Sequence, residues 1–123
     1  VTYMAAAHSA RFKAGVAWYG RLVKPAPDAF LGSENRLWPA DVAGDLKAPV
    51  LGLYAENDSG IPLSSVEAMR AALAKVGKAE TNPIIVYPGA QHGFHADYRP
   101  AFKADAAHDG WIRMLSWFQR NGV

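Results

Sequence analysis

Three short apolar runs constrain the fold of this chain more than any other feature of its sequence. They cover residues 14–20, 49–55 and 83–88. In each run, apolar residues occupy both of the faces that alternate along a strand, which is typical of a parallel sheet covered on both sides. The second run begins with Pro49, and proline is tolerated at the first position of a strand. The runs therefore predict a small parallel sheet of three strands.

Helical periodicity surrounds these runs. Two segments carry apolar stripes at helical spacing, namely Val66, Met69, Leu73 and Val76 in one and Trp111, Met114, Leu115 and Phe118 in the other. Residues 1–8 have the small, helix-favouring composition of a buried helix. Residues 21–48 form a long, irregular excursion, in which residues 41–46 are expected to make a short helical turn.

In order, the segments are helix, strand, excursion, strand, helix, strand and helix. This alternation predicts an α/β fold whose parallel strands are joined by right-handed crossovers. A chain of 123 residues, half of them apolar, suits one domain. Three strands are about half of what such folds usually contain, and the first helix begins at Val1 with no capping residue before it. We therefore expect residues 1–123 to be part of a domain that was once longer.

Composition excludes several classes of protein. Thirteen Lys and Arg residues stand against eleven Asp and Glu residues, and the basic residues do not cluster, so nucleic-acid binding is not expected. No apolar run approaches the ~20 residues that span a bilayer. The chain has no cysteine, which excludes disulfides, thiolate metal sites and a cysteine nucleophile within these residues. A cytoplasmic location is the default expectation, and no metal or cofactor is required.

Two polar loops follow the second and third apolar runs, at residues 56–62 and 89–95. In an open α/β sheet, loops at the carboxyl ends of the strands carry the active groups. Asp58 and His92 lie 34 positions apart in these loops, in the order in which the acid and the histidine of a nucleophile–His–Asp triad occur in α/β-hydrolases. We therefore expect the Asp58 carboxylate to hydrogen-bond the His92 imidazole.

Each candidate also has a simpler interpretation. Asp58 alone suits a turn that caps the following helix, and His92 alone suits a polar loop position. Glu56 is a rival for the role of the acid. His95 is interpreted as a surface residue or as a substrate-contacting group, and its spacing from His92 is weak evidence for a metal site.

These segments resemble the dienelactone hydrolase (carboxymethylenebutenolidase) family of α/β-hydrolases. Residues 48–62 resemble its acid-bearing segment and residues 87–94 its histidine segment, while residues 14–20 are similar to its strand ending in Tyr-Gly and residues 106–118 to its closing helix. The resemblance implies that Asp58 is the triad acid and His92 the general base. It also implies the C-terminal half of an α/β-hydrolase fold, with a three-stranded parallel sheet flanked by helices.

The departures from the family pattern concern the nucleophile and the substrate. The family's nucleophile, usually Cys in a Gly-x-Cys-x-Gly-Gly elbow, immediately precedes the helix that residues 1–9 resemble. This chain has no Cys and no Gly-x-Ser-x-Gly, so we expect the elbow in an N-terminal half upstream of Val1. Dienelactone-specific members place an Arg four residues after the histidine; that position is Ala96 here, and Arg99 is shifted.

The sequence therefore predicts that the intact protein hydrolyses small-molecule ester or lactone bonds. Tyr19, Trp38 and Phe94 are candidates for the walls of the substrate pocket, with packing in the core as the alternative for each. Peptidase or acyl-transfer chemistry on the same scaffold stays open. So does a truncated, non-catalytic module that pairs with another chain, either its own N-terminal half or a second copy, through the exposed sheet edge at residues 14–20.

Overall fold

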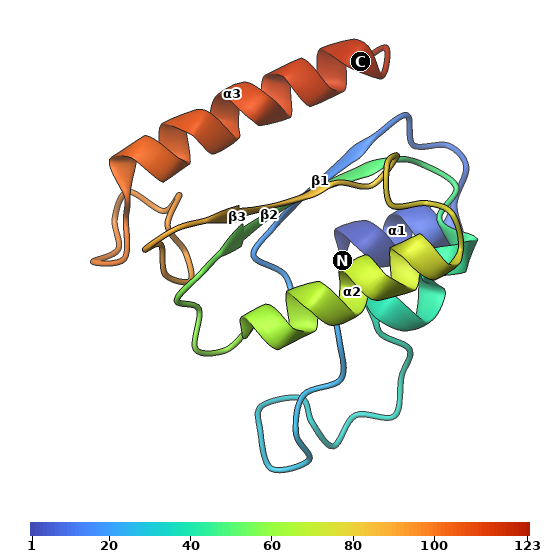
Figure 1. Ribbon diagram of the computed structural model, residues 1–123, viewed down its shortest axis with the longest axis horizontal. Helices are drawn as coiled ribbons and strands as arrows, with labels where there is room; N and C mark the ends of the chain where they lie inside the picture. The colour runs from blue at the N-terminus through green and yellow to red at the C-terminus, as the bar shows by residue number, and fades with distance from the viewer.

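A three-stranded parallel sheet organises the molecule in the computed structural model, which describes all 123 residues (Figure 1). The strands lie side by side in the order β1-β2-β3. Their bounds are β1 (Gly15–Trp18), β2 (Val50–Ala55) and β3 (Ile84–Tyr87). The helices are α1 (Thr2–His8), α2 (Leu63–Lys75) and α3 (Ala104–Arg120), with the 3-10 helix η1 (Pro39–Asp45) between β1 and β2. The predicted α/β order of elements is confirmed.

Helices cover both faces of the sheet. Figure 1 shows α1, α2 and η1 on one side and α3 on the other. Alternation along the central strand supplies both layers, because Val50 and Tyr54 face the first layer while Leu51 and Leu53 face the second. Every residue of β2 is buried, as its unbroken apolar sequence requires.

Helix α2 packs through the predicted stripe. Val66, Met69 and Leu73 are completely or almost completely buried against the sheet. Val76 is the exception, because the helix ends at Lys75 and the side chain of the following residue is half-exposed. Gly77 adopts a φ of +70° directly afterwards, a conformation that glycine reaches without a Cβ penalty.

Helix α3 forms as expected but buries a different face from the one predicted. Its buried residues are Ala106, Ala107, Gly110 and Trp117, whereas Trp111 and Leu115 are 47% and 51% exposed. Met114 and Phe118 are partly buried. The cause is shape: the Trp18 ring fills the space beside Gly110, so the small residues, rather than the large ones, allow the helix to approach the sheet.

The excursion between β1 and β2 extends away from the sheet and is drawn at the bottom of Figure 1. Its regular part is η1, which covers Pro39–Asp45, a slightly earlier range than the expected turn. The Asp41 side chain accepts a hydrogen bond from the Trp38 backbone N–H at 2.8 Å, which fixes the start of this helix.

A buried amide secures the amino end of the central strand. Asn82 Oδ1 accepts a 2.8 Å hydrogen bond from the Val50 N–H, and its Nδ2 donates to the Lys78 carbonyl and to Thr81 Oγ1. The sequence offered no signal for this contact, because Asn82 and Val50 belong to different segments. No helix in the structure combines the length and the apolar character that crossing a membrane needs.

Candidate active site

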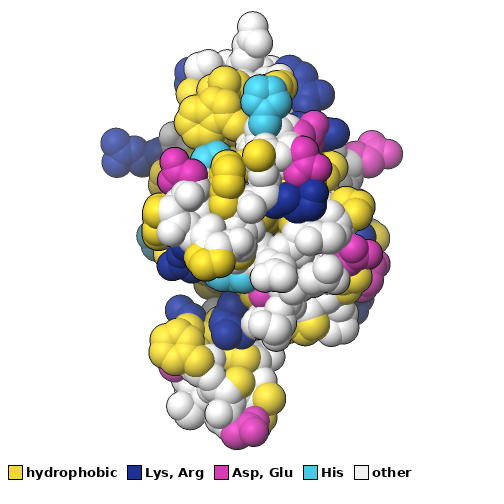
Figure 2. All heavy atoms as spheres, turned by 90° about the vertical axis from the view of Figure 1, so that its left-hand side faces the viewer, with side chains coloured by type: hydrophobic (Ala, Val, Ile, Leu, Met, Phe, Trp, Pro, Cys, Tyr) yellow, Lys and Arg dark blue, Asp and Glu magenta, His cyan; other side chains and the backbone are white.

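The loops after β2 and β3 are tied together at the carboxyl ends of the strands. The backbone N–H groups of Glu56 and Asn57 donate to the carbonyls of Tyr87 and Ala90, at 3.1 and 2.9 Å. The face that carries these strand ends is the one turned toward the viewer in Figure 2, where histidines lie among hydrophobic side chains. Parallel strands therefore bring the two polar loops to one place, as the sequence predicted.

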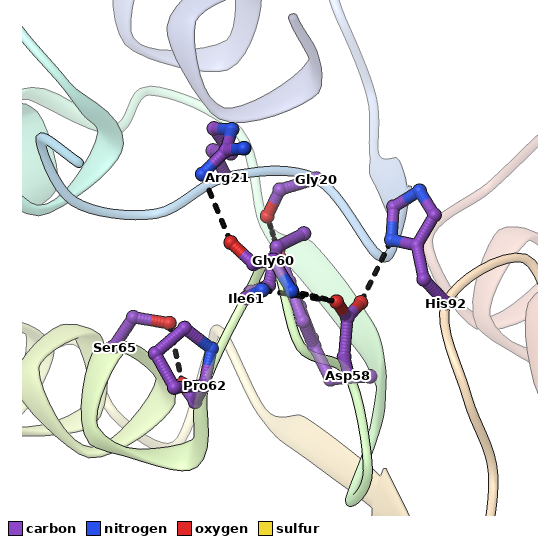
Figure 3. A network of polar contacts seen from close by, with 9 residues as sticks. Gly20, Arg21, Asp58, Gly60, Ile61, Pro62, Ser65 and His92 are labelled. Atoms are coloured by element: carbon purple, nitrogen blue, oxygen red, sulfur yellow. Dashed lines mark hydrogen bonds and ion pairs between the residues drawn. The ribbon is translucent and has the colours of Figure 1, made fainter. Parts of the chain in front are cut away.

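Asp58 and His92 form the expected pair. His92 Nδ1 and Asp58 Oδ2 are 2.7 Å apart (Figure 3). The Asp58 side chain is 1% exposed, whereas that of His92 is 48% exposed. The carboxylate is thus held inside the protein while the imidazole reaches the surface.

The second oxygen of Asp58 organises its own loop. Oδ1 accepts hydrogen bonds from the N–H groups of Gly60 and Ile61, both at 2.9 Å. The turn interpretation of Asp58 and the catalytic one are therefore compatible, because each uses a different oxygen. The carboxylate does not cap helix α2, which has no side-chain cap.

This arrangement fixes the imidazole tautomer. The Asp58 carboxylate accepts hydrogen bonds from two backbone N–H groups and has no hydrogen of its own to donate. The hydrogen in its contact with His92 is therefore carried by the Nδ1 atom of the imidazole. Nε2 is then unprotonated in the neutral ring, and it has no hydrogen-bond partner within the chain. A base with this orientation can take a proton from a group that lies within hydrogen-bond reach of Nε2.

Glu56 does not compete for the histidine. Its carboxylate Oε2 accepts a 2.8 Å hydrogen bond from the Gly89 N–H. Gly89 has a φ of +68°, so a glycine suits the turn that presents this N–H. Glu56 therefore ties the two loops together, and Asp58 is the carboxylate that contacts His92.

Tyr19 stands beside the pair. Its ring meets the His92 ring edge-on, with the centroids 5.1 Å apart. Its backbone has a φ of +38°, a left-handed conformation that is unusual for a bulky residue and often marks functional sites. The Tyr19 N–H donates to the Leu53 carbonyl at 2.8 Å, which holds this conformation at the end of β1. Burial raises the pKa of the Tyr19 hydroxyl, Tyr98 adds to the effect and Arg99 opposes it.

The other two pocket candidates behave as core residues. Phe94 is completely buried, and its ring packs beneath Tyr19 with the centroids 5.3 Å apart. Trp38 is 3% exposed, stacks under the Arg36 guanidinium and has no hydrogen bond or ring contact with Asp58 or His92. For both residues the structure favours the packing alternative, because neither ring presents a surface to a ligand.

His95 lies between two tryptophans. Its ring centroid is 4.4 Å from that of Trp18 and 5.7 Å from that of Trp111, with which it is stacked. It is partly buried, whereas His8 and His108 are exposed. The structure contains no group of three or more His, Asp or Glu side chains placed to hold a metal ion.

Two contacts join β2 and the loop that follows it to the segment after β1, and the sequence did not indicate either of them. Arg21 Nη1 donates to the Gly60 carbonyl at 2.9 Å, and the buried Tyr54 hydroxyl donates to the Gly20 carbonyl at the same distance (Figure 3). Both join residues more than thirty positions apart, so only the fold reveals them.

No serine or threonine hydroxyl of the chain hydrogen-bonds to His92. Ser65, near the acid-bearing loop, donates instead to the Pro62 carbonyl at 2.7 Å. The site therefore holds a carboxylate and an imidazole in contact, and no hydroxyl of the chain is hydrogen-bonded to the imidazole.

Comparison with known proteins identifies a family. The family model described as the dienelactone hydrolase family matches residues 1–122. A relative from Methylorubrum extorquens is 50% identical over 123 residues, and one from Escherichia coli K12 is 52% identical over 123 residues. Both are provisionally named carboxymethylenebutenolidases. The alignments cover 100% and 99% of this chain but only 40% and 42% of those proteins, so the chain spans less than half of their length.

Solved structures share the fold. A crystal structure from Klebsiella pneumoniae, provisionally titled a dienelactone hydrolase, superposes with a TM-score of 0.84 at 48% identity, covering 97% of this chain and 47% of that one. A propionate-bound esterase from Thermogutta terrifontis gives a TM-score of 0.63 at 16% identity, covering 89% of this chain and 43% of that one. At that identity the second similarity concerns the fold alone. The predicted α/β-hydrolase architecture is confirmed.

Proposed function

Because the chain belongs to the dienelactone hydrolase family, we propose that it supplies the acid and the base of an enzyme that hydrolyses ester or lactone bonds. The observation that carries the proposal is the 2.7 Å hydrogen bond between buried Asp58 and surface-reaching His92 at the carboxyl ends of neighbouring strands. The nucleophile, a thiol or a hydroxyl, comes from outside these 123 residues.

The chemistry follows from the orientation of the imidazole. His92 Nε2 removes the proton from the nucleophile, whose sulfur or oxygen attacks the carbonyl carbon of the ester. Asp58 accepts the Nδ1 hydrogen throughout, which holds the ring in position and stabilises the imidazolium that forms. His92 then returns the proton to the departing alkoxide. Water, activated by the same base, releases the acyl group.

The substrate is proposed to differ from the dienelactone of the founding enzymes. Position 96, four residues after His92, carries an alanine and therefore has no cation to hold a carboxylate. Esters and lactones without that requirement are the substrates we expect.

Substitution of the pair tests the proposal in the protein that includes the nucleophile-bearing segment. Hydrolysis of 4-nitrophenyl acetate should fall about 10⁴-fold in Asp58→Asn, because the imidazole loses the acceptor that fixes its tautomer. His92→Ala should lower it at least as much. Glu56→Gln is the matched control, since this carboxylate lies two residues away and binds only the Gly89 N–H, and it should stay within about threefold of wild type.

Two results would contradict the assignment. Full activity in both Asp58→Asn and His92→Ala would show that the pair is structural. A larger loss in Glu56→Gln than in Asp58→Asn would move the role of the acid to Glu56.

A further inference from the structure

A hollow lined mainly by aromatic side chains opens next to the catalytic pair. It has a volume of about 600 Å³ and lies between the loop that follows His92 and the first turns of α3. The residues that line it and matter here are Tyr19, His95, Tyr98, Phe102, Ala104 and Trp111. Its volume falls within the range of small-molecule sites, which is about 300–1,000 Å³. We refer to it as the aromatic hollow.

The rings of the aromatic hollow are open to solvent. Tyr98 is 80% exposed, Phe102 is 40% exposed and Trp111 is almost half-exposed. Large apolar side chains gathered at one exposed place usually mark a binding surface. Trp111 is not among the residues through which α3 is buried, which are Ala106, Ala107, Gly110 and Trp117.

Two of the rings are already held in place. His95 is fixed between Trp18 and Trp111, and its ring is inclined only 21° to that of Trp111. Tyr19 is fixed by its packing on Phe94 and by its backbone hydrogen bond to Leu53. Rings that do not need to be ordered on binding lose little entropy when a ligand arrives.

Tyr19 connects the hollow to the reacting centre. The same ring that lines the hollow lies edge-on to His92, with the centroids 5.1 Å apart. A planar group seated in the hollow would contact Tyr19, the same ring that contacts His92, so an ester group attached to it could extend past Tyr19 toward the histidine. Polar side chains, Asp97 and His108, also line it, so the apolar region is bounded and suits a small molecule.

We propose that the aromatic hollow binds the aromatic ring of the ester that this enzyme cleaves, so that aryl esters are its favoured substrates. The inference rests on the function proposed above and adds the chemical class of the substrate. Aromatic rings should bind more tightly than saturated rings of the same size. Both bury apolar surface, but only an aromatic ring also makes edge-to-face and offset-stacked contacts with the fixed rings of the hollow.

Binding to the chain itself tests this without any turnover. Phenyl acetate is titrated into the 123-residue chain and followed by the NMR shifts of the Trp111 indole N–H and of the Tyr98 and Phe102 backbone amides. Cyclohexyl acetate, whose ring has the same number of atoms, is the matched ligand. We expect saturable shifts at these residues and a dissociation constant about 3- to 10-fold lower for phenyl acetate, the range that aromatic pair contacts supply.

Variants locate the site. Trp111→Ala should weaken phenyl acetate binding about 3- to 10-fold. Leu115→Ala is the control, because Leu115 lies one turn further along α3, is equally exposed and does not line the hollow, and it should change binding less than twofold. Ala104→Phe places a large ring in the hollow from an exposed position at the start of α3, so it should also weaken phenyl acetate binding. This second variant tests the site even if Trp111→Ala fails to fold.

The outcomes separate this inference from the proposed function. Equal affinity for the two esters, shifts confined to other parts of the chain, or an equal loss in Leu115→Ala would refute it. If Asp58→Asn abolishes hydrolysis while phenyl acetate does not bind the hollow, the proposed function stands and the inference fails. If phenyl acetate binds there and Asp58→Asn hydrolyses normally, the proposed function fails instead.

Discussion

Gly110→Ala is a sharp test of how α3 sits on the sheet, because two physical effects oppose each other there. A Cβ at Gly110 would lie 2.7 Å from Trp18 Cη2 and 2.9 Å from Cζ3. Carbon atoms in contact are about 3.5–4.0 Å apart, so the helix or the indole must move by about 0.8 Å or more. Helix propensity acts in the other direction, since alanine inside a helix is favoured over glycine by about 1 kcal/mol.

The structure predicts that the clash prevails. Overpacking of a close contact costs about 1–3 kcal/mol, so the free energy of unfolding should fall by about 1 kcal/mol after the gain in helix propensity is subtracted. Urea unfolding followed by far-UV circular dichroism measures this change. Because Trp18 also contacts His95, the displaced helix should shift the NMR signals of the aromatic hollow as well.

Two controls make the result decisive. Gly20→Ala should be neutral or slightly stabilising, because nothing lies within 4 Å of its added Cβ. In a Trp18→Leu background, Gly110→Ala should become stabilising, since the obstructing indole is gone. Stabilisation by Gly110→Ala in the wild-type background would refute the described packing of α3 against Trp18.

Two further predictions concern stability. Asn82→Ala should lower the free energy of unfolding, measured in urea, by about 1–3 kcal/mol, because the Val50 N–H at the start of β2 would be buried without its acceptor. Surface substitutions usually change this free energy by less than about 0.5 kcal/mol, so a loss below that value would contradict the prediction. For Asp109, hydrogen bonds donated by Tyr87 and Arg113 hold the pKa of the carboxyl below its ordinary value. The stability that this provides is complete above the unfolded pKa of about 3.9 and is lost as the pH falls through the lower folded pKa. Asp109→Asn should therefore lose less stability between pH 7 and pH 3 than wild type, and equal losses would show that the carboxylate is not coupled to folding.

The positions of the strands and of the polar loops that follow them could be predicted, because both are marked by short stretches of consecutive residues. Apolar runs of strand length define β2 and β3, and the polar residues that directly follow them necessarily meet at one edge of a parallel sheet. That position brings His92 close to both Glu56 and Asp58, and the choice of Asp58 came from the family resemblance.

The buried face of α3 could not be predicted, because periodicity ranks side chains by hydrophobicity and ignores their shape. Trp111 is more apolar than Gly110, yet only Gly110 fits beneath the indole of Trp18. Phe94 and Trp38 show the same limit, since an aromatic residue near a loop suits a core as well as a pocket wall. The left-handed backbone of Tyr19 has no signal in the sequence either.

The ties between the loops after β2 and β3 affect how the site moves. Glu56 and Asn57 anchor one loop to the other through hydrogen bonds to Tyr87, Gly89 and Ala90. Separating the two loops would break all three of these hydrogen bonds, so they favour joint displacement of Asp58 and His92 over a change in the distance between them. The loops are also linked to their surroundings, since Arg21 of the excursion donates to the Gly60 carbonyl and His95 stacks on Trp111 of α3, so a rearrangement of either neighbour reaches the Asp58–His92 pair through a single contact.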